Sequence, residues 1–137
     1  MQIYFISTND SSRSKMAEGF AKVILPTSWI IKSAGVSADK ISPYAIQVMS
    51  EVGIDIAEEP SQSIDDTILT NSDVVVSLSR DAKSKTLALP TSVQAVHWPL
   101  NDPAMATGSE KQKVAAFREI RDEIKQYVTN IRDEYRQ

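Results

Sequence analysis

The sequence of 137 residues contains no cysteine and only one histidine, His97. Without cysteine, the chain can form no disulfide, can offer no thiolate to a metal and has no thiol nucleophile. A single histidine also excludes a metal site built from several imidazoles. The sequence therefore excludes the enzymes and metal centres that depend on thiols or on histidine clusters.

Long apolar runs and blocks of one charge sign are missing as well. No apolar run approaches the ~20 residues that a membrane-spanning helix needs, and no secretory signal pattern precedes the first apolar segment. The net charge of −3 gives no basic field for nucleic acid, and no lysine block suggests a membrane surface. We expect one cytoplasmic domain, residues 1–137, without nucleic-acid or membrane partners.

Short apolar segments alternate along the chain with segments of helical periodicity. This alternation is typical of a sheet covered by helices and predicts an α/β layer fold with right-handed crossovers. The expected strands are Gln2–Ile6, Trp29–Ser33, Asp73–Ser79 and Val93–Trp98. The expected helices are Arg13–Leu25, Ser42–Gly53, Asp65–Thr70, Arg80–Leu87 and Glu110–Tyr135.

The segment from Ile3 to Ser14 organises the rest of the chain. It consists of a short apolar strand, a run of small polar residues and an arginine that opens a helix. Loop amides and first-turn helical amides lack partners, and the helix dipole favours negative charge there, so this segment is suited to holding an anion. Arg13 adds a planar fork of donors for a tetrahedral oxyanion. The loops at 7–13, 79–85 and 99–102 all follow strand carboxyl ends, which predicts one shared site.

This arrangement resembles the low-molecular-weight protein tyrosine phosphatases and, more closely, the thioredoxin-coupled arsenate reductases of the same fold. Those proteins carry Cys-x5-Arg-Ser after the first strand, where this chain has Ser7-x5-Arg13-Ser14. The resemblance implies a single three-layer domain with a four-stranded parallel sheet in the order 2-1-3-4. It continues in order through Met16-Ala17-Glu18-Gly19, Ser33-Ala34-Gly35, Ser72-Asp73-Val74-Val75, His97-Trp98 and Asn101-Asp102-Pro103.

In the resembled families the loop cysteine attacks phosphorus or arsenic as a thiolate, and Ser7 takes its place here. A helix N-terminus and an arginine bring a thiol from its ordinary pKa of ~8.5 to below neutral, but they cannot ionise a serine hydroxyl. A serine nucleophile needs an adjacent general base. The resemblance further implies that Arg13 holds the oxyanion, Ser14 supports the nucleophile and Asp102 protonates the leaving oxygen. Asp102-Pro103 is also a common turn pair.

The reductase branch needs two further cysteines to carry oxidising equivalents away as a disulfide. Ser79 and Thr86 stand at those redox positions, and Ser12 stands where many relatives have a second loop cysteine. Thiol-coupled arsenate reduction is therefore excluded for this chain. The chain is either a natural non-catalytic member or an engineered cysteine-free variant, and Asn9, where the family has glycine, favours the natural origin.

The resemblance assigns anion binding to seven consecutive loop residues, of which Asp10 departs from the family asparagine. A carboxylate that faced the anion would oppose phosphate by ~1–4 kcal/mol, whereas one behind the loop would accept amide hydrogen bonds. Reductases of this family also hold a monovalent cation there, with matching positions at Asp10, Glu18 and Ser33, although Gln62 replaces an aspartate. The seven residues are Thr8, Asn9, Asp10, Ser11, Ser12, Arg13 and Ser14.

The sequence thus predicts a phosphatase-like and arsenate-reductase-like pseudoenzyme whose loop binds phosphate, sulfate or a phosphorylated ligand without a cofactor. One alternative is a protein-interaction or regulatory module with a vestigial loop. Another is a weak phosphatase that uses Ser7 or water with Asp102. A Ser7–His97–Asp102 triad is conceivable, but no pattern delivers His97 to Ser7.

Overall fold

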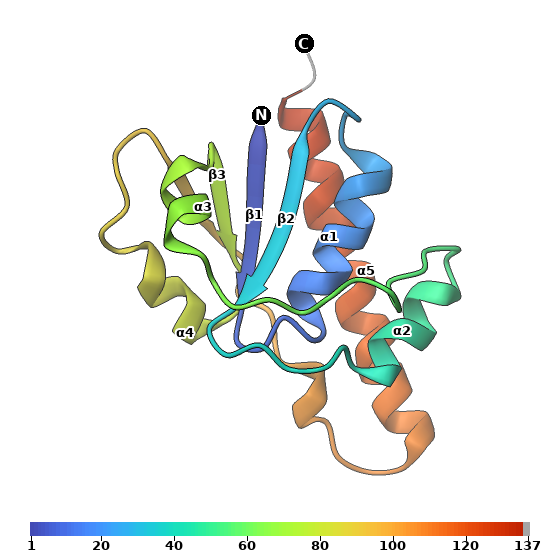
Figure 1. Cartoon of the computed structure of the whole chain (residues 1–137). Coiled ribbons are helices and arrows are strands. Elements are labelled where there is room, and N and C mark those ends of the chain that lie inside the picture. The colour runs from blue at the N-terminus through green and yellow to red at the C-terminus, as the bar shows by residue number, and fades with distance from the viewer. Residues whose placement is uncertain (136–137) are drawn as a thin grey trace.

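The computed structural model describes residues 1–135 and forms one parallel sheet with strands in the order β2-β1-β3-β4 (Figure 1). The predicted α/β class and strand order are confirmed. The strands are β1 (Gln2–Ser7), β2 (Ile30–Gly35), β3 (Val74–Ser77) and β4 (Gln94–His97). The helices are α1 (Arg13–Ile24), α2 (Pro43–Ser50), α3 (Asp66–Asn71), α4 (Arg80–Lys83) and α5 (Glu110–Glu134), with 3₁₀ turns η1 (Ser84–Thr86) and η2 (Pro103–Met105).

Several element boundaries differ from the expected ones. The expected helix Arg80–Leu87 is split into α4 and η1, because the hydroxyls of Ser84 and Thr86 bond to carbonyls three residues earlier and compete with helical hydrogen bonds. Strand β3 stops at Ser77, since Ser79 already caps α4. Helix α2 ends at Ser50, and the chain then turns through Gly53, whose φ is +78°.

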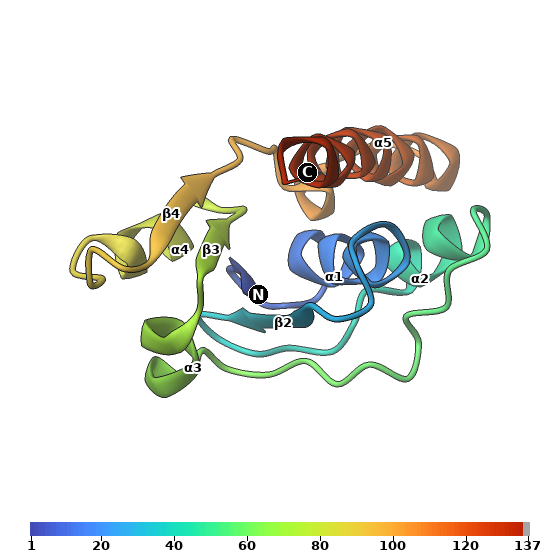
Figure 2. The ribbon, with the colours of Figure 1, turned by 90° about the horizontal axis from the view of Figure 1, so that it is seen from above.

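The two faces of the sheet carry separate apolar cores, as the alternation along β1 requires. Ile3 and Phe5 pack with α1, α2 and α5 in the larger core, whereas Tyr4 and Ile6 pack on the opposite face. Figure 2 shows α1, α2 and α5 together on one side of the sheet and α3 and α4 on the other. Strand β1 is buried on both faces, as a central parallel strand should be. Within residues 1–135, no helix is both long and apolar enough to cross a lipid bilayer.

Gly35 sets how closely the loop after β1 approaches the end of β2. It pairs with Ser7 in the parallel register, and its neighbour Val36 donates to the Ser7 carbonyl. A Cβ at Gly35 would lie 2.6 Å from both the Asn9 carbonyl carbon and the Asp10 nitrogen. Because both are backbone atoms that cannot rotate away, only glycine allows this contact. The sheet therefore fixes the loop from one side.

We predict that Gly35→Ala lowers the free energy of unfolding by about 1–3 kcal/mol, the usual cost of overpacking, and loosens the loop. Urea denaturation measures the first effect, and amide hydrogen exchange at Asp10 measures the second. Gly53→Ala is the control, because its added Cβ meets nothing within 4 Å and only its positive φ opposes the change. If the hydrogen-exchange rate of the Asp10 amide were the same in Gly35→Ala as in the wild type, contact with the end of β2 would not stabilise the loop.

Candidate functional site

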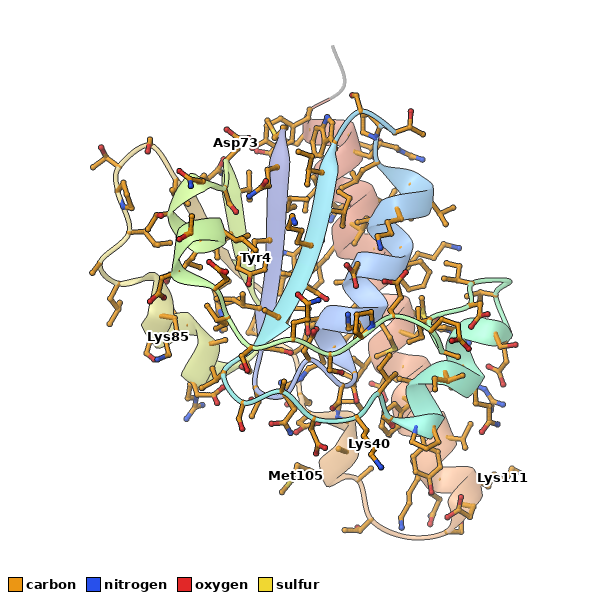
Figure 3. All side chains as sticks on the ribbon, viewed as in Figure 1. Tyr4, Lys40, Asp73, Lys85, Met105 and Lys111 are labelled. Carbon is orange, nitrogen blue, oxygen red and sulfur yellow. The ribbon has the colours of Figure 1, made fainter. Side chains whose placement is uncertain are left out.

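The loop between β1 and α1 surrounds a cavity of about 30 Å³ at the carboxyl end of the sheet. Figure 3 shows that the labelled Lys40 and Met105 lie at this end of the molecule, whereas Asp73 lies at the opposite end. One water needs ~10–15 Å³, so the cavity suits a small ion and not a bulky organic group. It is lined by Ser7, Thr8, Asn9, Ser11, Ser12, Arg13, Asp102 and Ala104.

The backbone of this loop offers several amide donors to the cavity. Within residues 1–135, the amides of Thr8, Asn9, Ser11, Ser12 and Arg13 donate no hydrogen bond, although all five residues line the cavity. Successive free amides beside a helix N-terminus form a concave site for an anion. Helix α1 begins at Arg13 and has no acidic residue in its first turn. The backbone therefore favours negative charge in the cavity.

Arg13 is fixed in place by three neighbours. Its Nη1 donates to the carbonyls of Leu78 at 3.0 Å and Leu100 at 3.2 Å, and its Nη2 lies 3.6 Å from Asp102 Oδ2. Burial lowers the pKa of Arg13, while the charge of Asp102 opposes this shift; an arginine nevertheless remains charged at neutral pH. The guanidinium thus stands at the cavity wall with its orientation fixed in advance.

Asp102 takes the turn role that the sequence offered, and its carboxylate also lies at the predicted site. Its Oδ1 accepts from the Ala104 amide at 2.9 Å and caps η2, while its Oδ2 faces the Arg13 guanidinium. Its side chain is 37% exposed and lines the cavity. The Asp-Pro pair therefore makes a turn that also brings a carboxylate to the predicted site.

Ser7 begins a chain of hydroxyl groups that leads away from the cavity. Its Oγ lies 2.6 Å from Ser14 Oγ and accepts the Asp10 amide at 3.3 Å. Ser14 Oγ donates in turn to Asp10 Oδ1 at 2.7 Å. A hydroxyl has one proton to donate, so the proton between the two serines must come from Ser7.

The Asp10 carboxylate points behind the loop and not toward the anion cavity, which decides between the two orientations that the sequence allowed. The residue is fully buried, its φ is +52°, and its Oδ2 accepts the Gln62 amide at 3.0 Å. Aspartate tolerates this left-handed conformation better than most residues. Burial is the largest influence on the pKa of Asp10 and raises it, although bonds from Ser14 and Gln62 and the charge of Lys15 act in the opposite direction.

Two of the three residues that match a monovalent-cation site, Asp10 and Glu18, already contact an ammonium group of this chain. Lys15 Nζ lies 3.5 Å from Asp10 Oδ2 and 3.1 Å from Glu18 Oε1, and Ser33 Oγ donates to the same Glu18 oxygen at 3.0 Å. The Lys15 side chain is only 3% exposed. The carboxylates are thus paired with an internal ammonium, and we expect that they do not hold an added monovalent ion. Lys15 was missed in the sequence, although its i,i+3 spacing to Glu18 could have indicated the pair.

The other predicted residues lie apart from this hydroxyl chain. Ser79 caps α4 and bonds to Asp81, and Thr86 bonds to the Lys83 carbonyl. His97 Nδ1 bonds to Ser77, and both burial and nearby Lys83 lower its pKa. Ser7, His97 and Asp102 each have different partners, so the conceivable triad is not assembled.

A further contact joins the loop to α4. Thr8 Oγ1 donates to Asp81 Oδ1 at 2.8 Å, the oxygen that also accepts from Ser79. No pattern in the sequence predicts this contact.

Comparison with known proteins agrees with this geometry. Residues 2–137 match the family model for low molecular weight phosphotyrosine protein phosphatase. An arsenate reductase of Bacillus subtilis (strain 168) is 48% identical over 122 residues, which are 89% of this chain and 88% of the relative. A structure of an arsenate reductase in the phosphate binding state is 32% identical, with a TM-score of 0.78 and 98% of each chain covered.

A further solved structure shares the fold. It is the YwlE arginine phosphatase in a mutant form with a phosphorylated active-site serine, and its TM-score is 0.81 over 98% of this chain and 95% of that chain. Because it is 22% identical, this likeness concerns the fold alone.

We predict that K⁺ does not stabilise the wild-type chain and that Lys15→Gln creates a K⁺ requirement. Removing one partner of a buried ion pair costs about 3–5 kcal/mol, and a free cation can restore part of this loss. Urea denaturation in KCl and in N-methylglucamine chloride of equal ionic strength measures both effects. Lys22→Gln is the matched control, since its side chain is 43% exposed and surface pairs contribute ~0–1 kcal/mol. If K⁺ stabilised the wild type, the interpretation that Lys15 takes the place of a monovalent cation would be wrong.

Proposed function

Because this chain belongs to the low molecular weight phosphotyrosine protein phosphatase family, we propose that its loop binds a tetrahedral oxyanion or a phosphorylated ligand without catalytic turnover. The observation that carries the proposal is the cavity lined by five residues with free amides, one of which, Arg13, also contributes its guanidinium. An arsenate reductase relative of 32% identity has been solved in the phosphate binding state, which supports phosphate as the occupant. Because the chain contains no cysteine, the binding that we propose does not involve a thiol.

The serine at position 7 accounts for the absence of turnover. The family chemistry that the resemblance implies requires a thiolate. A serine hydroxyl beside the same helix N-terminus and arginine stays protonated at neutral pH. The redox positions Ser79 and Thr86 are occupied by hydroxyls that bond to their own turns. We therefore propose a pseudoenzyme that recognises oxyanions in the cytoplasm.

We predict that phosphate and arsenate bind the wild type and that Arg13→Ala binds them about 10–100-fold more weakly. A hydrogen bond to a charged group contributes about 1.5–3 kcal/mol, which corresponds to that range. Isothermal titration calorimetry measures the affinities, and circular dichroism checks that the variant folds, because Arg13 also holds two carbonyls. Arg132→Ala is the control, since Arg132 lies in the last turn of α5. Equal heats for wild type and Arg13→Ala would reject the proposal and leave an interaction module with a vestigial loop.

We further predict that Ser7→Cys hydrolyses an aryl phosphate while the wild type does not turn it over. The variant restores only the nucleophile, so activity would show that the remaining site is intact. Release of 4-nitrophenol under steady-state conditions is the measurement, with Ser7→Ala as the inactive reference. Steady wild-type turnover that is lost in Asp102→Asn would instead support a weak phosphatase and overturn the non-catalytic function.

A further inference from the structure

The serine that replaces the thiol is joined by hydrogen bonds to a buried carboxylate. Ser7 Oγ–H donates to Ser14, and Ser14 donates to Asp10 Oδ1, with distances of 2.6 and 2.7 Å. Ser14 and Asp10 are fully buried, so water does not compete for either bond. The direction of donation is fixed by the carboxylate, because an ionised carboxylate can only accept.

The orientation of Ser7 suits attack on an occupant of the cavity. Its proton points toward Ser14, and the Asp10 amide occupies one acceptor position of its oxygen. A hydroxyl oxygen has two acceptor positions, and Ser7 lines the cavity. The second lone pair accepts no hydrogen bond from residues 1–135, so it is available to an occupant of the cavity.

We propose that Ser7 accepts a phosphoryl group from a bound donor while its proton passes through Ser14 to Asp10. This goes beyond the proposed function and rests on it, since the donor must first occupy the anion cavity. The Ser7 Oγ–P bond forms as the bond from phosphorus to the leaving oxygen breaks. The leaving oxygen takes the bonding electron pair, the Ser7 proton moves to Ser14, and the Ser14 proton moves to Asp10.

The surroundings of Asp102 indicate which class of donor reacts. Its two oxygens face a guanidinium and a backbone amide, both of which are donors that suit a carboxylate. No proton is therefore offered to the leaving group from this side. The reactive donors are those whose leaving group departs as an anion without help, such as acyl phosphates, and the product is phosphoserine at position 7.

The charges around Asp10 allow it to take up and release a proton. Lys15 lies at 3.5 Å and is shared with Glu18, and the phenol of Tyr4 is the further titratable group near it, on β1. Burial raises the pKa of Asp10 above its ordinary value of 3.8. A carboxylate with a raised pKa is a stronger base, and proton transfer to a positioned base contributes ~10²–10⁴-fold to a rate.

The test uses the intact chain with acetyl phosphate as donor. Intact-mass spectrometry follows the addition of one HPO₃ unit over time, and fragment spectra locate the modified residue. We expect a single addition at Ser7 in the wild type and none in Ser7→Ala. Asp10→Asn retains an oxygen that accepts from Ser14 but binds no proton, so its labelling rate should fall about 10²-fold. The exposed Asp39→Asn is the matched acid-to-amide control and should label at the wild-type rate.

The pH dependence separates a proton acceptor from a merely structural aspartate. Because only ionised Asp10 accepts the proton, the wild-type rate should fall with decreasing pH through the raised pKa of Asp10. In Asp10→Asn this fall in the labelling rate should be absent, and the rate should change with pH only through the titration of acetyl phosphate. Equal rates or identical pH profiles for wild type and Asp10→Asn would overturn the relay, as would equal labelling of Ser7→Ala.

Phosphate calorimetry on the same samples distinguishes the two proposals. Heats of phosphate binding without any labelling would reject the relay and leave oxyanion binding intact. Absence of both heats and labelling would reject the proposed function together with the relay. If Asp10→Asn fails to bind phosphate, Ser14→Ala replaces it, and unchanged labelling in that variant overturns the relay.

Discussion

One buried carboxylate holds the loop of this protein together. Asp10 receives hydrogen bonds from the Ser14 hydroxyl and the Gln62 amide, faces the Lys15 ammonium, and occupies the left-handed turn of the loop. These partners come from helix α1 and from the segment before α3, so a single side chain joins elements that are distant in the sequence. An unpaired charge at this depth would be costly, whereas a paired and hydrogen-bonded one is tolerated. The shape of the anion cavity depends on this arrangement.

The carboxylate lies close to the cavity without lining it. It is directed behind the backbone, and the cavity side of the loop is left with free amides and the Arg13 guanidinium. The negative charge of Asp10 is balanced by Lys15, so its repulsion of an anion in front of the loop is reduced. An asparagine would fill the same position without needing the lysine. The aspartate and the buried lysine are therefore understood as one charge pair.

The fold and the location of the site follow from local patterns in the sequence. The apolar strand Ile3–Ile6, the polar loop and the helix at Arg13 are adjacent in the chain, so periodicity and turn chemistry are sufficient to predict them. The side-chain partners are different. Arg13 meets the carbonyls of Leu78 and Leu100, which are 65 and 87 residues away, and backbone carbonyls leave no mark in a sequence. The orientation of the Asp10 carboxylate also depends on the Gln62 amide, 52 residues later. The sequence therefore left two orientations open, one toward the anion and one behind the loop.

The hydrogen bonds that join Ser7 through Ser14 to Asp10 alter how the serine at position 7 is interpreted. A serine alone in an arginine-lined cavity is inert, because neither a helix dipole nor a guanidinium ionises an alcohol. A serine whose proton is already directed through Ser14 toward a carboxylate has the arrangement that alcohol nucleophiles require. In a thiolate enzyme the same carboxylate would be unfavourable, since a second negative charge near the sulfur would raise the pKa of the thiol. Serine at position 7 and aspartate at position 10 are thus chemically compatible with each other, whereas a cysteine at position 7 would have a higher thiol pKa beside this aspartate than beside an asparagine.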